Sequence, residues 1–165
     1  MQNILTFCFS LLDLALKNNL QRSTTGSQGG DKQVSTVRTS RTAWIKRENS
    51  PIVDAIIRRA ADSLKIDEAM MRHRMPDEFP ALAKNTPINE DLQVVHYSQS
   101  QQYTAHHDFG YPDTRPNAPS RSINLCIYLN EGMTGGETAF PRWRNADTDD
   151  AVKAVPKKGK ASKLT

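Results

Sequence analysis

The sequence has few cysteines, few aromatic residues and no histidine after position 107. Two cysteines in 165 residues exclude a disulfide framework. The first sixteen residues are apolar, yet they lack the basic segment and the small-residue cleavage site of a signal peptide, and they are too few to span a bilayer. We therefore predict neither a clear signal peptide nor a transmembrane segment, and the cysteine content does not decide the compartment.

Positive charge is in modest excess. The formal net charge is +4, and four lysines lie close to the C-terminus, at positions 157, 158, 160 and 163. Nucleic-acid-binding surfaces combine basic residues with aromatic ones, and no aromatic residue lies among these lysines. The pattern favours a solvated basic segment, and no nucleic-acid partner is predicted.

The order of predicted elements indicates an α+β protein. Ser10 is a candidate cap for a helix that ends near Lys17, and Ser50 with Pro51 opens a second helix with one apolar stripe. Asp67 is a candidate cap for another short helix. Strands are predicted within 37–46 and at 92–97, 102–109, 122–130, 137–140 and 152–155. This order divides the chain into a supporting region, 1–90, and a core, 91–165.

The most informative segment is the run from Tyr103 to Asp108, which contains two adjacent histidines. Side chains two apart on an extended strand share a face, so His106 and Asp108 are predicted to point the same way. By the same spacing, His107 is predicted to lie on the other face, and so is Tyr103 unless a bulge intervenes. An imidazole and a carboxylate on one face supply two of the three ligands of a 2-His-1-carboxylate iron site.

Several motifs follow one another along the chain. They are VRTS at 37–40, YSQSQQYTAHHD at 97–108, Arg121, IYLN at 127–130, GGETAFP at 135–141 and VPKKGK at 155–160. Their order and approximate spacing resemble the prolyl 4-hydroxylase family of 2-oxoglutarate/Fe(II) oxygenases. The resemblance covers most of the chain, from about residue 11 to 160.

This resemblance implies a double-stranded β-helix, or jelly-roll, core that holds one iron through His106 and Asp108. It implies Fe(II), 2-oxoglutarate as cosubstrate and L-ascorbate as reductant, with hydroxylation of peptidyl proline and release of succinate and CO₂. Tyr97 and Tyr128 stand where the family often places tyrosines around the cosubstrate, and barrel-core packing is an equal alternative for both. Arg38 is a candidate for contact with a proline-containing peptide or protein. The resemblance also points to the endoplasmic reticulum and secretory pathway.

The sequence departs from the family at its far end. The distal histidine ligand and the basic residue that anchors 2-oxoglutarate would follow the VPKKGK segment, and neither is found there. We therefore expect a C-terminally truncated member that lacks the last core strands and is weakly active or inactive. The alternative is a non-catalytic relative of the same fold that binds a peptide or a partner. The residues do not predict an oligomeric state.

Overall fold

The structure is a computed structural model, and it describes residues 4–25, 33–34, 36–72, 88–108 and 123–164. The chain divides into two compact units. The first, which we call the helical unit, consists of Ser10–Arg22 and Arg41–His96. The second, the site unit, consists of Met1–Phe9, Ser23–Ser40 and Tyr97–Thr165. The division predicted from the sequence, at residue 90, stays a prediction.

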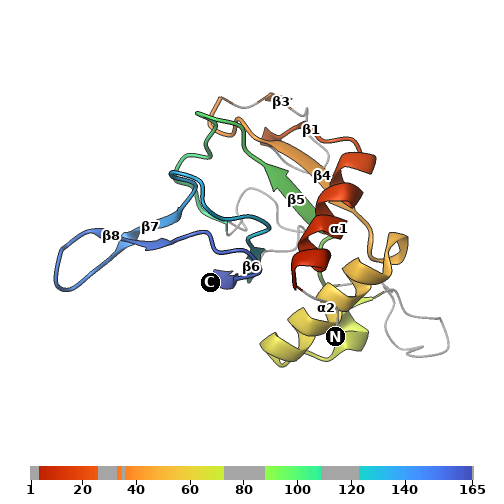
Figure 1. The fold of residues 1–165 in the computed structure, drawn as a ribbon. Coiled ribbons are helices and arrows are strands. Elements are labelled where there is room, and N and C mark those ends of the chain that lie inside the picture. The colour runs from red at the N-terminus through yellow and green to blue at the C-terminus, as the bar shows by residue number, and fades with distance from the viewer. Residues whose placement is uncertain (1–3, 26–32, 35, 73–87, 109–122, 165) are drawn as a thin grey trace. The chain divides into compact units, whose positions relative to one another are not determined.

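The helical unit is built on a small antiparallel sheet. Strand β4 (Arg41–Ile45) lies in its middle, between β1 (Gln21–Arg22) and β5 (Leu92–His96) (Figure 1). Ala43 pairs with Val94, and both are buried. The other elements of this unit are the 3₁₀ turn η1 (Arg47–Asn49), helix α2 (Pro51–Leu64), the 3₁₀ turn η2 (Glu68–Met71) and most of helix α1 (Ile4–Lys17).

Helix α2 forms where the sequence predicts it, and local signals explain both ends. The Ser50 hydroxyl accepts a hydrogen bond from the backbone N–H of Ile52 at 3.2 Å, and Pro51 occupies the first turn. The helix ends at Leu64, and the residue that caps it, Lys65, has a left-handed φ of 57°. Its apolar stripe is buried in the core of the unit, through Val53, Ile56, Ile57, Ala60 and Ala61.

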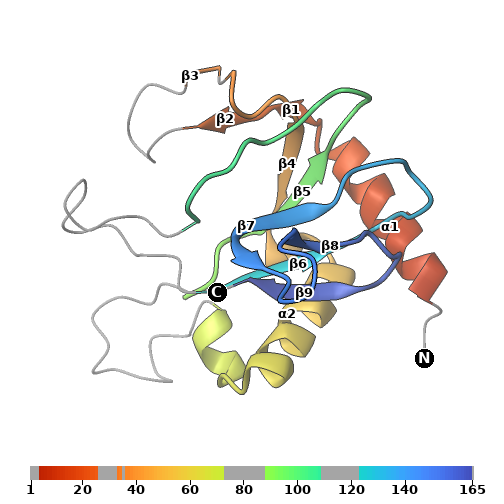
Figure 2. The ribbon, with the colours of Figure 1, turned by 90° about the vertical axis from the view of Figure 1, so that its left-hand side faces the viewer.

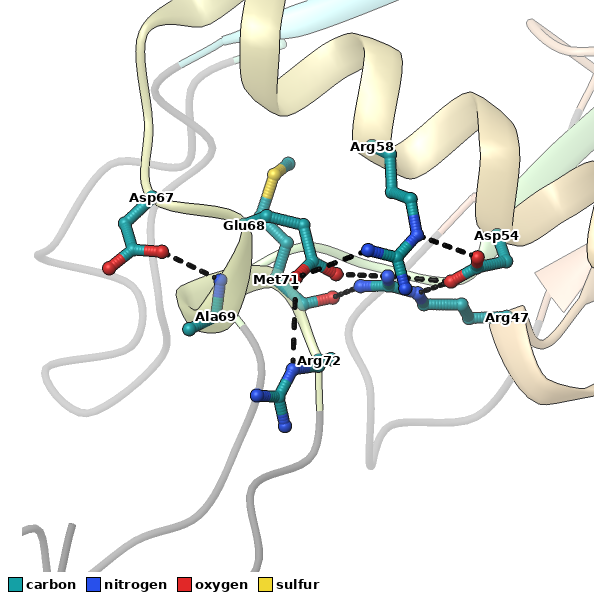
Figure 3. Close-up of polar contacts among 8 residues, drawn as sticks. All are labelled: Arg47, Asp54, Arg58, Asp67, Glu68, Ala69, Met71 and Arg72. Atoms are coloured by element: carbon teal, nitrogen blue, oxygen red, sulfur yellow. Dashed lines mark hydrogen bonds and ion pairs between the residues drawn. The ribbon is translucent and has the colours of Figure 1, made fainter. Parts of the chain in front are cut away.

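A cluster of charged side chains joins η1, α2 and η2, and Arg47 lies at its centre (Figure 3). Its guanidinium donates to Asp54 at 2.7 Å, to the carbonyl oxygen of Met71 at 2.9 Å, and to Glu68. Arg58 pairs with the second oxygen of Asp54 at 2.8 Å. Because the Arg47 side chain is only 13% exposed, these contacts hold the two short turns against α2 in a partly dehydrated setting.

The site unit contains short antiparallel strand pairs (Figure 2). Strand β7 carries Pro141, which has no N–H to donate, and its register with β8 shifts between Phe140 and Arg144. The pairs are β2 (Thr24–Thr25) with β3 (Gln33–Val34), β6 (Asn124–Ile127) with β9 (Ala161–Leu164), and β7 (Thr138–Arg144) with β8 (Ala151–Ala154).

Two predictions about elements are wrong in detail, and one strand was not predicted. Helix α1 begins at Ile4, so Ser10 lies inside it rather than at its cap. Residues 102–108 form no strand, apart from one isolated bridge at Tyr103. The basic segment near the C-terminus includes strand β9, where Lys163 pairs with Leu125 of β6. Strand β9 was not predicted because its partner strand, β6, lies more than 30 residues away in sequence.

Candidate metal centre

The segment before His106 is fixed by backbone pairing with residues 37–39. The N–H of Thr39 donates to the carbonyl of Gln102 at 3.0 Å, and the N–H of Thr104 donates to the carbonyl of Val37 at 3.0 Å. Between these bonds, Arg38 and Tyr103 form an antiparallel bridge. The Thr39 hydroxyl adds a bond from the Gln102 N–H at 2.9 Å. This short ladder ends at Thr104, directly before the two histidines.

His106 and Asp108 converge, as predicted. The His106 Nε2 atom lies 3.1 Å from Asp108 Oδ1, and the His106 Nδ1 atom lies 2.7 Å from the carbonyl oxygen of Thr104. Both side chains are partly open to solvent, at 36% and 40% exposure. They therefore form an accessible pair of donor atoms on one short stretch of chain, although the stretch is not the strand from which their common direction was predicted.

The hydrogen bond to Thr104 determines what the other ring nitrogen can do. A carbonyl oxygen only accepts, so Nδ1 must carry a proton in this contact. In the neutral ring, Nε2 then presents a lone pair toward the Asp108 carboxylate. Because both atoms are electron-pair donors, they attract each other only when a proton or a cation lies between them. Metal-binding histidines commonly donate their other N–H to a backbone carbonyl in this way. The pair thus fits one nitrogen and one oxygen ligand of a divalent metal.

A third donor is not in place among residues 4–25, 33–34, 36–72, 88–108 and 123–164: no group of three His, Cys, Asp or Glu side chains there could hold a metal ion.

The charge of Asp108 influences the pKa of the Cys126 thiol, on β6. Burial raises the pKa of Cys126, and the negative charge of Asp108 raises it further. The thiol is therefore more reluctant than a free cysteine to become the nucleophilic thiolate.

Tyr103 is not on the opposite side from His106, contrary to the strand-spacing prediction. Its ring stacks on the imidazole, with 3.6 Å between the ring centroids and 17° between the ring planes. The guanidinium carbon of Arg38 lies 4.9 Å from the centre of the Tyr103 ring. The prediction failed because it assumed an extended strand, and the chain leaves the ladder after Thr104.

The adjacent histidine has a different neighbour. An Nη2 atom of Arg142, on β7, lies 3.4 Å from the His107 Nε2 atom. Both side chains are exposed. Sequence reasoning missed this contact because the two residues are 35 positions apart and no local motif joins them.

The two candidate cosubstrate tyrosines lie in different settings. Tyr97 directly follows β5, and its side chain is 44% exposed. Tyr128 follows β6 and is partly buried, and its hydroxyl donates to Thr138 Oγ1 at 2.8 Å. Arg121, another residue of the predicted motif series, lies outside the described residues.

Comparison with known proteins finds that this chain is similar to oxygenases. Residues 92–163 match the model of the 2OG-Fe(II) oxygenase superfamily. The chain is 33% identical to prolyl 4-hydroxylase 2 of Arabidopsis thaliana over 164 residues, which is 94% of this chain and 48% of that protein. It is 30% identical to the probable prolyl 4-hydroxylase 3 of the same plant over 81% of this chain and 41% of that protein.

An animal protein is also similar. The chain is 26% identical to prolyl 4-hydroxylase subunit alpha-2 of Caenorhabditis elegans over 73% of its length, which corresponds to 20% of that subunit. The chain therefore spans about half, or less, of the length of the curated relatives it matches. None of the helices that the structure describes has both the length and the apolar character needed to cross a bilayer.

Proposed function

We propose that this chain, which belongs to the prolyl 4-hydroxylase-like 2-oxoglutarate/Fe(II) oxygenases, contributes part of the active site of a dioxygenase that hydroxylates peptidyl proline. The superfamily has a jelly-roll fold and uses Fe(II) and 2-oxoglutarate. The proposed reaction releases succinate and CO₂, and L-ascorbate keeps the iron reduced. Proline as the target comes from the names of the similar plant and nematode proteins.

The observation that carries this proposal is the convergence of His106 Nε2 and Asp108 Oδ1, 3.1 Å apart. A carboxylate and an imidazole are suitable ligands for Fe(II) in a facial site with open positions. Because Nδ1 donates to the Thr104 carbonyl, the neutral ring directs the lone pair of Nε2 toward Asp108. When bound, iron and 2-oxoglutarate supply the oxidative chemistry, and the protein orients the groups around them.

The remaining site residues are proposed in supporting roles. The hydroxyls of Tyr97 and Tyr128 would donate hydrogen bonds to oxygen atoms of 2-oxoglutarate. Arg38 would contact the proline-containing peptide or protein. The Arg38 guanidinium already lies over the Tyr103 ring. In this role it would contact the peptide either while it stays over that ring or after it has moved away from it.

A metal titration tests the proposed ligands. The 165-residue chain is expected to bind Mn(II) weakly, because it supplies two of the three protein ligands of such a site. We expect His106→Ala and Asp108→Ala to lower the Mn(II) affinity at least about 10-fold, as measured by electron paramagnetic resonance. His96→Ala is the matched control, since His96 is an exposed histidine at the end of β5. Equal affinity in all four proteins would refute the assignment.

An activity assay tests the reaction. With a proline-rich peptide, Fe(II), 2-oxoglutarate and ascorbate, we expect these 165 residues to release little or no succinate, because the part of the chain that the structure describes brings together two candidate ligands and no third. Fast succinate release coupled to peptide hydroxylation would contradict that expectation. The alternative proposal is a non-catalytic relative that binds a peptide or a partner, and it is favoured if the peptide binds equally well with and without metal.

A further inference from the structure

We propose that Tyr103 is a positioning residue that fixes the plane of the His106 ring, and that Arg38 holds Tyr103 in place. Two contacts of the Tyr103 ring join three side chains from two segments: the Arg38 guanidinium lies over this ring, and the ring stacks on that of His106. The inference rests on the proposed metal function for its purpose, but the stack itself can be tested without metal.

The geometry of the rings supports a specific contact. A centroid distance of 3.6 Å with planes only 17° apart places the two rings face to face, in van der Waals contact. The Thr104 carbonyl holds the same imidazole at Nδ1, 2.7 Å away. The bond from Cβ and this hydrogen bond together still allow the ring plane to tilt. The stacked tyrosine restricts that tilt, so Nε2 remains directed at Asp108.

Tyr103 can restrict the His106 ring because hydrogen bonds hold the backbone around Tyr103 in place. It lies between the two hydrogen bonds of the short ladder, where it bridges Arg38. Arg38, its partner in that bridge, also places a cation over the ring: the guanidinium carbon lies 4.9 Å from the centre of the Tyr103 ring. Cations favour the electron-rich face of an aromatic ring, and the effect at partly exposed sites is modest. Arg38 therefore strengthens the position of Tyr103 without touching the metal ligands.

The test begins with metal-free protein and NMR of the His106 ring protons. A tyrosine ring stacked at this distance shifts them upfield, and Tyr103→Leu is expected to move them back downfield. Tyr103→Phe keeps the ring and should keep the shift. If the ring protons have the same shifts in wild type and in Tyr103→Leu, the stack does not exist in solution and the proposal is overturned.

The second measurement is Co(II) affinity, followed by absorption spectroscopy. We expect Tyr103→Leu to weaken Co(II) binding about 10-fold, as losses of residues that orient metal ligands do. Tyr103→Phe should stay within about twofold, and Arg38→Met should weaken binding about threefold. Arg41→Met is the matched control, because Arg41 is an exposed arginine nearby in sequence, on β4.

The outcomes separate this inference from the proposed function. Wild-type protein that binds no Co(II) contradicts the proposed function, and the metal-free NMR comparison then decides the stack by itself. Wild-type protein that binds Co(II) no more tightly than Tyr103→Leu leaves the function standing and overturns the positioning role. Circular dichroism of each variant verifies that the fold persists. If Tyr103→Leu unfolds, Tyr103→Phe and Arg38→Met still decide the question: a loss of affinity in Tyr103→Phe, or none in Arg38→Met, overturns the proposal.

Discussion

Tyr128 joins two strand pairs of the site unit through its hydroxyl group. The hydroxyl donates to Thr138 Oγ1 at 2.8 Å, on β7, and lies 3.2 Å from the carbonyl oxygen of Ala154, on β8. Its backbone meanwhile exchanges hydrogen bonds with Gly159 and Lys160, beside β9. Tyr128, which is a candidate for contact with the cosubstrate, therefore also has a structural role. If 2-oxoglutarate binds its hydroxyl, it must do so beside these two contacts or in place of them.

Tyr128→Phe tests the structural role. The substitution removes a partly buried hydroxyl and leaves Thr138 and Ala154 without that contact, so we expect the free energy of unfolding to fall by about 1 kcal/mol. Urea denaturation followed by circular dichroism measures it. Tyr97→Phe is the control, because the Tyr97 side chain is 44% exposed and its hydroxyl can exchange a lost contact for water. Equal stability of wild type and Tyr128→Phe would contradict the prediction.

Arg47→Met should be among the more destabilising single changes in the helical unit. It removes the donor that contacts Asp54, Glu68 and the Met71 carbonyl and leaves two carboxylates close together. Hydrogen bonds to charged groups typically contribute about 1.5–3 kcal/mol, so we expect a loss of about 2 kcal/mol in urea denaturation. Arg22→Met, at an exposed position on β1, is the control. A loss no larger than that of the control would show that the cluster adds little.

The same cluster predicts a dependence of stability on pH. The hydrogen bond from Arg58, followed by the contact with Arg47, holds the pKa of Asp54 below its ordinary value of 3.8. A carboxyl with a lowered folded pKa stabilises the protein above its unfolded pKa, and this contribution is lost as the pH falls through the folded pKa. We expect wild type to be more stable than Asp54→Asn at pH 6.

The difference between the two proteins should shrink as the pH is lowered below about 4. Thermal unfolding of both proteins over this range measures the effect. Because the Asp54 side chain is 36% exposed, high salt should also reduce it. A difference that stays constant from pH 6 to pH 3 would exclude the ion pairs as its source.

Cys126 provides a chemical probe of Asp108. Burial and the Asp108 charge raise the pKa of the thiol, so the reactive thiolate is scarce near neutral pH. We expect iodoacetamide to modify Cys126 several-fold more slowly than a free cysteine at pH 8, and the rate to increase as the pH rises. Asp108→Asn should accelerate the reaction by removing the negative charge.

Mass spectrometry of the alkylated peptide measures the rate, in a Cys8→Ser background that leaves a single thiol. Asp150→Asn serves as a matched control, since Asp150 is an exposed carboxylate directly before β8. An unchanged rate in Asp108→Asn would mean that burial alone sets the reactivity of Cys126.

Features that depend on a few neighbouring residues could be predicted from the sequence alone. The Ser50 cap, Pro51 and the apolar stripe that follows predict helix α2 because a helix forms within a few residues of its own signals. The pair His106 and Asp108 likewise lies within three positions, and the ordered motifs pointed to the oxygenase family that the comparisons support.

Contacts between residues far apart in the chain could be identified only in the folded protein. The Arg38 guanidinium over Tyr103, the Arg142 contact with His107 and the pairing of β6 with β9 each join residues more than 30 positions apart. Tyr103 and His106 are close in sequence, yet their stack depends on where the ladder with residues 37–39 ends. Local patterns fix the direction of a side chain only while the backbone stays regular, and here the backbone leaves the extended form at the site itself.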